Sequence, residues 1–334
     1  MSNTKELREA IESAIPGDVI VLADGEYIIT GAPLRLGRPN YSFKSLLPII
    51  LSSENYKKAV IKVSRAVGMQ ITHKNWIVSN LVFEGTCDAD SSCEHALHIF
   101  GDADDLQIIG NDFVNFNAAI KANGSAFSID SSTRHFPDQV LVDNNRFYNH
   151  WTRETKAPVT PIDVVGGSNW TISNNFIADF SRLYRNKPSY TYGAFLKGDS
   201  KNGVFKSNFV ACNWRVPYYS ALDQRVGLSF GGGGTGHEFC ATGNCEQEHR
   251  GGEMSDNVIV NCSQSASVYI NNSHDINVLS NSMIGSSGIE LRRSKNIKVM
   301  ENLMNGKIRP RDEISSFAEQ SNQYFHDQIN YLRP

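Results

Sequence analysis

The chain has 334 residues, of which 40% are hydrophobic and 20% are charged, and this composition is enough for a large folded core. Its formal net charge of −3 gives no support for nucleic-acid binding, which needs a basic stripe. The sequence has no apolar run long enough to span a membrane. We therefore expect neither nucleic acid nor membrane among its partners.

The first predicted element is a helix over 4–15, whose apolar residues Leu7, Ile11 and Ile15 share one face. A Pro-Gly-Asp sequence ends it, and the run Val-Ile-Val-Leu that follows is typical of a buried strand. An amphipathic helix ahead of the first strand is the lid that an open-ended solenoid needs. Residues 1–17 are therefore expected to form an N-terminal cap.

From there a unit recurs along the chain. It consists of a short strand, a turn rich in Gly, Asn, Asp or Ser, a second strand, an Asn-rich step and an apolar residue. Clear copies are 96–113, 161–177, 194–210, 268–284 and 289–304. Short strands stacked coil on coil are typical of a parallel β-helix. A β-sandwich is the competing all-β fold, but signals for hairpins are too scarce for it.

The predicted fold is therefore all-β: one right-handed parallel β-helix domain over residues 1–334. Its coils are expected over 18–308, and 309–334 are expected to form a C-terminal tail or cap with a short helical segment. Asparagine recurs before the closing apolar residue of each unit, at Asn80, Asn111, Asn145, Asn175, Asn208, Asn257, Asn281 and Asn302. Asn tolerates the left-handed conformation of sharp corners, and stacked amides can form ladders, so we expect a structural role.

Six cysteines bear on folding and on location. Cys87 and Cys93 bracket an acidic loop, and Cys240 and Cys245 bracket a loop with Gly and Asn. Both spacings can close short disulfides, while free thiols or small buried hydrophobes are an equal alternative. Residues 1–10 hold no signal sequence. Two locations stay open: extracytoplasmic (periplasmic or secreted) after removal of a signal peptide, which the cysteines favour, or cytoplasmic.

Aligning the units places seven outward-facing residues in one column. In most of these strands the flanking residues are apolar and point inward, so the residue between them points outward. The column members are His98, Lys121, Asp163, Lys197, Ser229, Tyr269 and Glu290. With coils about 4.8 Å apart the column spans about 29 Å, which suits several sugar units. The plain alternative is a solvated sheet, whose outward residues are usually polar.

The column suits β-elimination of a uronate polymer. This reaction needs a base for the C5 proton, an acid for the leaving group, and a cation or metal for the carboxylate. Lys197 is the first choice of base, since neighbouring cations or burial can lower its pKa from about 10.4. His98 is the second choice, and Tyr269 is the expected acid.

The expected substrate-binding residues are Lys121, Asp163, Arg225, Ser229, Glu290 and Arg292. Of these, Arg225 and Arg292 are candidates for gripping carboxylates. No cofactor follows from the sequence alone, although Asp163 and Glu238 are candidate ligands for Ca²⁺. Four consecutive glycines at 231–234 fit either a ligand-contacting loop or a merely flexible one.

Two segments resemble the parallel β-helix polysaccharide lyases, especially polysaccharide lyase family 6, which holds alginate lyases and chondroitin B lyase. The opening at 6–27 is similar to that family's start, and 196–210 is similar to its coil with the catalytic lysine. The resemblance implies cleavage of uronate-containing polysaccharides by β-elimination, often with Ca²⁺, and makes Lys197 the base. The family's glutamate pair before the lysine and its Arg-His pair on the next coil are absent here. Its calcium ligands and arginine acid are therefore not carried over.

The predicted function is a lyase acting on an anionic polysaccharide or oligosaccharide. A glycoside hydrolase is a competing candidate, but it needs two carboxylates roughly 5–10 Å apart. The column offers only Asp163 and Glu290, four coils apart. A uronate epimerase and a non-catalytic glycan-binding protein also stay open on the same scaffold.

Overall fold

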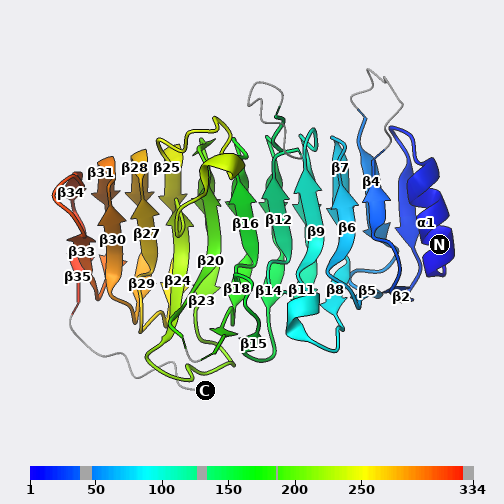
Figure 1. Ribbon diagram of the computed structural model, residues 1–334, viewed down its shortest axis with the longest axis horizontal. Helices are drawn as coiled ribbons and strands as arrows, with labels where there is room; N and C mark the ends of the chain where they lie inside the picture. Colours follow the sequence, from blue (N-terminus) through cyan, green and yellow to red (C-terminus); the bar gives the residue numbers. More distant parts are fainter. Residues whose placement is uncertain (38–46, 126–133, 186, 326–334) are drawn as a thin grey trace.

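The computed structural model describes residues 1–37, 47–125, 134–185 and 187–325. Within them the chain winds as a right-handed parallel β-helix, in which three sheets run along the length of the molecule (Figure 1). Every pairing within these three sheets joins parallel strands from successive coils, because each turn of the chain adds one strand to each sheet. The predicted fold class is thus confirmed.

The first sheet contains β1 (Val19–Leu22), β4 (Ile49–Ser53), β7 (Trp76–Ser79), β10 (Gln107–Ile109), β13 (Leu141–Asp143), β17 (Thr171–Ser173), β22 (Val204–Lys206), β25 (His249–Ser255), β28 (Ser273–Leu279), β31 (Lys295–Met300) and β34 (Phe317–Gln320), with β21 (Ser200–Lys201) beside β25. The second contains β2 (Gly25–Ile29), β5 (Ala59–Val63), β8 (Val82–Gly85), β11 (Asp112–Val114), β14 (Arg146–Tyr148), β18 (Phe176–Ala178), β23 (Phe209–Ala211), β26 (Val258–Val260), β29 (Ser282–Ile284), β32 (Leu303–Met304) and β35 (Gln323–Tyr324).

The third sheet, which carries the candidate site, contains β3 (Leu34–Leu36), β6 (Val67–Ile71), β9 (His95–Phe100), β12 (Ile120–Asn123), β16 (Ile162–Val165), β20 (Ser189–Lys197), β24 (Asp223–Phe230), β27 (Val268–Asn271), β30 (Gly288–Arg292) and β33 (Lys307–Pro310). A small separate pair joins β15 (Arg153–Glu154) to β19 (Arg182–Leu183). Two short 3₁₀ turns, η1 (Asp90–Ser92) and η3 (His237–Phe239), lie in connecting loops.

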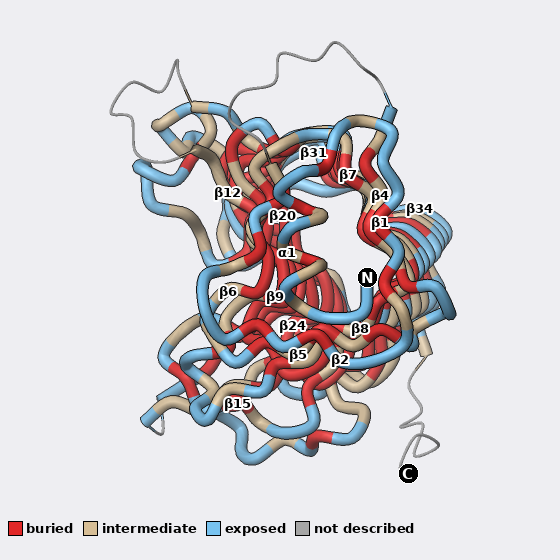
Figure 2. Tube along the Cα trace, turned by 90° about the vertical axis from the view of Figure 1, so that its right-hand side faces the viewer, coloured by how far each residue is buried: buried red, intermediate tan, exposed pale blue. Residues whose placement is uncertain are grey.

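Alternation of apolar and polar residues builds the core. In β4 and β5 every second residue is buried, because successive side chains of a strand point to opposite faces. Parallel registers then stack like on like inside the coil: Phe113 lies between Phe83 and Phe147, with ring centroids 5.0 and 4.8 Å away. Figure 2 shows the buried residues repeating coil after coil along the molecule. No coil could bury its apolar face alone, so each depends on its neighbours.

The N-terminal cap is helix α1 (Thr4–Ser13), which lies at the end of the solenoid (Figure 1). The side chain of Asn3 caps it by accepting a hydrogen bond of 3.0 Å from the backbone of Glu6. Leu7 and Ile11 are buried, as predicted, and pack into the core of the first coil. Ile15 lies beyond the helix and is 45% exposed, so the apolar face is shorter than predicted.

At the C-terminal end the structure differs from the prediction. Strands β33, β34 and β35 carry the three sheets on to Tyr324, so the coils continue past residue 308. No helix forms in the described part of 309–334, and the rest of that segment (326–334) lies outside the described residues. The cause is an asparagine: Asn322 accepts a 3.0 Å hydrogen bond from the amide of Asn302 and so closes one more coil.

The predicted asparagine ladder is present along one corner. From Asn111 to Asn302 each side-chain amide donates to the next ladder asparagine, at 2.9–3.1 Å. The left-handed residue is the one before each ladder position, for example Asn144 (φ 53°) before Asn145, and not the ladder asparagine itself. Asn80 (φ 59°) takes this corner position, and Leu81 stands in the ladder. The ladder satisfies buried amides that would otherwise cost about 1–3 kcal/mol each.

All six cysteines are paired. Cys87–Cys93 and Cys240–Cys245 are the two short loops seen in the sequence, and the disulfide alternative is the one present. Cys212–Cys262 joins neighbouring coils, a pairing that the sequence did not indicate. None of the described helices is both long and apolar enough to cross a membrane.

Candidate functional site

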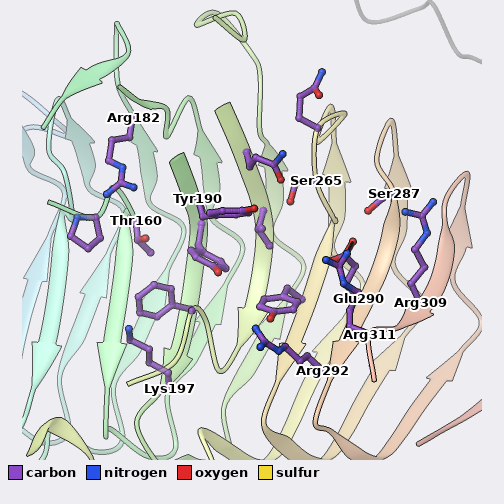
Figure 3. Close-up of a pocket in the computed structure, with 18 of the residues that line it drawn as sticks. Thr160, Arg182, Tyr190, Lys197, Ser265, Ser287, Glu290, Arg292, Arg309 and Arg311 are labelled. Carbon is purple, nitrogen blue, oxygen red and sulfur yellow. Dashed lines mark hydrogen bonds and ion pairs between the residues drawn. The ribbon is translucent and has the colours of Figure 1, made fainter. Parts of the chain in front are cut away.

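A cleft of about 1000 Å³ lies on the outer face of the third sheet. Its floor comes from β20, β24, β27, β30 and β33, and its walls come from β19, from the loops before β16, β27 and β30, and from the loop after β24. Figure 3 shows Lys197 at one end and Arg309 at the other, with Arg292 between them. Segments that are far apart in sequence thus supply one continuous groove.

The column predicted from the sequence exists, but Lys197 is not one of its members. Asp163 pairs with Phe195, which therefore takes the column position, and Lys197 pairs with Val165 two residues further along β20. The observed column is His98, Lys121, Asp163, Phe195, Ser229, Tyr269, Glu290 and Arg309. A shift of two residues preserves the face of a strand, so Lys197 still points outward, one row away, in the row of Arg292.

Lys197 is partly buried and held from two sides. Its Nζ donates to the carbonyl of Gly234 at 3.2 Å and lies 4.5 Å above the ring centroid of Phe195. Burial lowers the pKa of Lys197, and the positive charge of Lys121 adds to this; the carboxylates of Asp163 and Glu248 oppose it. The lysine is therefore closer to a usable base than a solvated lysine is.

Two tyrosines form the middle of the cleft. The ring centroids of Tyr192 and Tyr269 are 6.5 Å apart with nearly parallel planes, and Tyr192 meets Phe195 edge-on at 5.4 Å. Burial raises the pKa of both phenols, while a hydrogen bond with Arg292 opposes the rise at Tyr269. Tyr269 therefore keeps its proton at neutral pH and can donate it.

The lining has a strong excess of positive charge. Its cationic residues are Arg182, Lys197, Arg292, Arg309 and Arg311, and Glu290 is the one carboxylate among the described lining residues. Glu290 forms an ion pair with Arg311 at 3.1 Å and so neutralises one of these cations. The cleft therefore suits an anionic ligand, and its guanidinium groups can bind carboxylates with two parallel hydrogen bonds.

His98, Lys121 and Asp163 stand in the column but outside the cleft lining. Lys121 and Asp163 form an ion pair at 2.7 Å, and the ring of His98 bonds Asn123 at 2.8 Å. Burial lowers the pKa of His98. Of the nine expected site residues, the cleft brings together four: Lys197, Tyr269, Glu290 and Arg292.

The structure places Arg225 and Ser229 out of reach of a substrate. Arg225 is fully buried, bonded to Asp223 at 2.6 Å and to the carbonyls of Cys212 and Val216 at 2.8 and 2.7 Å. Arg225 therefore has a structural role and does not bind a substrate carboxylate as expected, because all its donors are directed into the protein. Ser229 faces outward in the column but is covered by the glycine-rich loop, and its hydroxyl accepts from the backbone of Gly232 at 3.0 Å.

The site does not fit the calcium ion that the family resemblance implies. Among the described residues, no three His, Cys, Asp or Glu side chains lie together in a way that could hold a metal ion. Asp163 is committed to Lys121, and Glu238 is exposed in η3, where its carbonyl accepts from Arg134. Positive charge in the cleft comes from arginines and Lys197 instead.

Sequence reasoning missed several lining residues: Arg182, Tyr190, Tyr192, Phe195, Arg309 and Arg311. Arg309 and Arg311 carried a usable signal, since they alternate in the same way as Glu290 and Arg292 on the preceding coil. Arg182 and Tyr190 lie in and beside an insertion between coils, where no repeat register applies.

The fold and the cleft define the class: a parallel β-helix protein with a groove along one sheet. Solved structures share this fold. The alginate lyase from Paenibacillus sp. str. FPU-7 matches with a TM-score of 0.51 and 11% identity, covering 96% of this chain and 94% of that one. The A-module of the mannuronan C-5 epimerase AlgE6 of Azotobacter vinelandii matches with a TM-score of 0.53 and 12% identity, covering 97% and 96%.

The Agl-KA catalytic domain matches with a TM-score of 0.59 and 12% identity, covering 95% of this chain and 61% of that one. No family model and no curated protein matches the sequence. The resemblance to parallel β-helix polysaccharide lyases is thus confirmed in the fold, and at such identities the likeness concerns the fold alone.

Proposed function

We propose that this protein is a polysaccharide lyase that cleaves a uronate-containing polysaccharide or oligosaccharide by β-elimination, with Lys197 as the base. One observation carries the proposal. A partly buried lysine shares a single cleft with a phenol and arginine pair, Tyr269 and Arg292, and with an excess of positive charge. These are the base, the acid and the carboxylate-binding group that the reaction needs.

The first requirement is to stabilise the charge that develops on the uronate carboxylate when its C5 proton leaves. A guanidinium can bind both carboxylate oxygens, and its charge is worth more in a groove that excludes water. Arg292 stands in the same row as Lys197, three coils along the sheet, with Arg311 on the next coil. We assign binding of the reacting carboxylate to Arg292, and contact with the substrate beyond the reacting sugar to Arg311.

The second requirement is proton transfer. Neutral Lys197 takes the C5 proton, the C5–H electron pair forms the C4=C5 double bond, and the C4–O4 bond breaks. Tyr269 gives its proton to the departing O4, and exchange with solvent then restores both residues. The backbones of β20 and β27 lie two coils apart, about 10 Å, which leaves room for a sugar ring between the two side chains.

Other chemistry on this scaffold is less well supported. A hydrolase needs two carboxylates at one bond, and the described lining has only Glu290, which is already paired with Arg311. An epimerase would share the first proton abstraction and then return a proton to the opposite face of C5. It is the second candidate, because Lys197 and Tyr269 could serve the two faces. The three disulfides favour an oxidising, extracytoplasmic location.

Incubation with a panel of anionic polysaccharides (alginate, pectate and glycosaminoglycans) tests the proposal, with products followed by ultraviolet absorbance and mass spectrometry. A lyase yields fragments with an unsaturated sugar at the new end. Fragments without unsaturation would indicate a hydrolase, and an unbroken chain that gains solvent deuterium at C5 would indicate an epimerase. Retention on the polysaccharide without any conversion would indicate a glycan-binding protein and overturn the enzymatic proposal.

A further inference from the structure

The glycine-rich loop at 231–236 packs directly on the lysine of the cleft. Besides the hydrogen bond from Nζ to Gly234, the loop touches the stem of the side chain: a Cβ on Gly232 would lie 3.4 Å from Cδ of Lys197. The same Cβ would lie 3.2 Å from the ring of Phe195. The position of this loop therefore determines where the ammonium group of Lys197 lies.

One buried carboxylate fixes the loop. Glu248 is 4% exposed, and its Oε1 accepts a hydrogen bond of 2.6 Å from the backbone of Thr235. Its Oε2 accepts from the Thr235 hydroxyl at 2.7 Å and from the backbone of Gly198 at 2.8 Å. Gly198 directly follows Lys197, and Thr235 directly follows Gly234. A single side chain thus joins the two backbone segments that place the lysine and its carbonyl partner.

We propose that Glu248 is the positioning residue of Lys197: its carboxylate clasps the glycine-rich loop to the end of β20 and so holds the ammonium group at one point of the cleft. The expected effect on turnover rests on the proposed function, whereas the expected effect on the position and reactivity of Lys197 does not.

Backbone hydrogen bonds to neighbouring coils hold Glu248 itself in place. The backbone of Glu248 donates to the carbonyl of Asn272 at 2.7 Å, and its carbonyl accepts from the backbone of Ser200 at 3.2 Å. Strand β25 begins at the next residue, His249, which is fully buried. The segment between Thr235 and Glu248 is closed further by the Cys240–Cys245 disulfide. Glu248 therefore belongs to the rigid coil, and the loop is fastened to it.

The charges that face Lys197 set the direction of the test. Burial and Lys121 lower the pKa of Lys197, and Asp163 and Glu248 raise it. Removing the charge of Glu248 therefore lowers the pKa of Lys197 further, and loss of the clasp frees its Nζ from Gly234. Both effects make the amine more reactive at a given pH. A general loss of stability would instead raise the labelling of other partly buried lysines, such as Lys121, as well.

The test is competitive acylation of the lysines of the whole folded protein with a small anhydride over a range of pH, read by mass spectrometry. In Glu248→Gln and Glu248→Ala we expect labelling of Lys197 at neutral pH to rise about tenfold relative to the other lysines. Thr235→Val, which removes only the hydroxyl, should give a smaller rise. Glu246→Gln changes an exposed carboxylate two residues before Glu248 and should change nothing.

Unchanged relative labelling of Lys197 in folded Glu248→Gln would overturn the proposal; if that variant does not fold, Thr235→Val decides in the same way. In the turnover arm, kcat should fall on the order of tenfold to a hundredfold in Glu248→Gln while KM changes little. If the wild type converts no polysaccharide but the labelling still changes, the proposed function fails and the clasp stands. If turnover is intact and labelling is unchanged, the clasp alone fails.

Discussion

The ammonium group of Lys197 lies 4.5 Å above the ring of Phe195, two residues earlier on the same strand. The two side chains share a face because residues i and i+2 of a strand point the same way. Phe195 stands in the column between Asp163 and Ser229. Its ring therefore supports the side chain of Lys197 at the edge of the cleft. A ring face attracts a cation most strongly where water is partly excluded, as it is here.

Replacing Phe195 with Leu should lower kcat about two- to thirtyfold. The change removes the ring face that holds the lysine, and such contacts contribute about 0.5–2 kcal/mol. Steady-state kinetics and thermal unfolding together measure the effect. Phe209→Leu alters an exposed ring of the second sheet and is the matched control. Equal kinetic losses in both variants would contradict a specific role for Phe195.

Tyr269→Phe removes the proposed acid and preserves the ring that packs near Tyr192. We expect kcat to fall on the order of a hundredfold, the usual worth of one general acid, with a smaller change in KM. Tyr56→Phe, at an exposed position outside the cleft lining, should behave as the wild type. Full activity in Tyr269→Phe would assign the acid to another group.

Arg309→Ala and Arg311→Ala should weaken substrate binding more than they slow the reaction. Both arginines line the cleft beyond Glu290 and are exposed, so they contact substrate away from the reacting bond. KM should rise about tenfold, and the dependence of kcat/KM on salt should become weaker. Arg250→Ala removes an arginine that pairs with Asp275 outside the cleft and is the control. An unchanged KM in both cleft variants would contradict binding at this end.

Stability should fall in acid because of His249. This ring is fully buried, stacks on Phe230 at 4.1 Å and bonds Ser200 at 2.7 Å. Burial lowers the pKa of His249 to about 3, from the ordinary 6.5. Between those values the unfolded chain binds a proton that the folded chain does not. The free energy of unfolding should therefore fall as pH drops from 6.5 toward 3, with a limiting slope of about 1.4 kcal/mol per pH unit.

Urea unfolding of the wild type and of His249→Gln at several pH values measures this effect. Burial also lowers the pKa of His95, to about 4, so part of the slope remains in the variant. The variant should lose the share that belongs to one proton, whatever its absolute stability. Parallel curves for the two proteins would contradict this assignment.

The coils could be predicted from the sequence because each coil has the same structural requirements. Every coil needs inward apolar residues, a left-handed corner and a partner for a buried amide. The recurring asparagines, such as Asn145 and Asn175, meet the last requirement and are visible in the sequence itself. The same logic found the face of Lys197. It placed Lys197 in the wrong row, because a register error of two residues leaves the alternation of inward and outward side chains unchanged and β20 is long.

Insertions between coils were not predictable in this way. Arg225 resembles an outward cation in the sequence, yet its strand begins at Asp223, which pairs with it inside the protein at 2.6 Å. Whether a charge is buried depends on a partner that the repeat does not specify. The link between Glu248 and Thr235 was hidden for the same reason, since it joins the two ends of a loop that follows no repeat.

Lys197 is the proposed base, and the most direct test of that role compares Lys197→Met with Lys206→Met, which changes an exposed lysine of the first sheet. Both variants should bind the polysaccharide substrate. Formation of unsaturated ends should fall by about 10²–10⁴-fold in Lys197→Met and stay at the wild-type rate in Lys206→Met. A Lys197→Met protein that forms unsaturated ends within about twofold of the wild-type rate would contradict the mechanism.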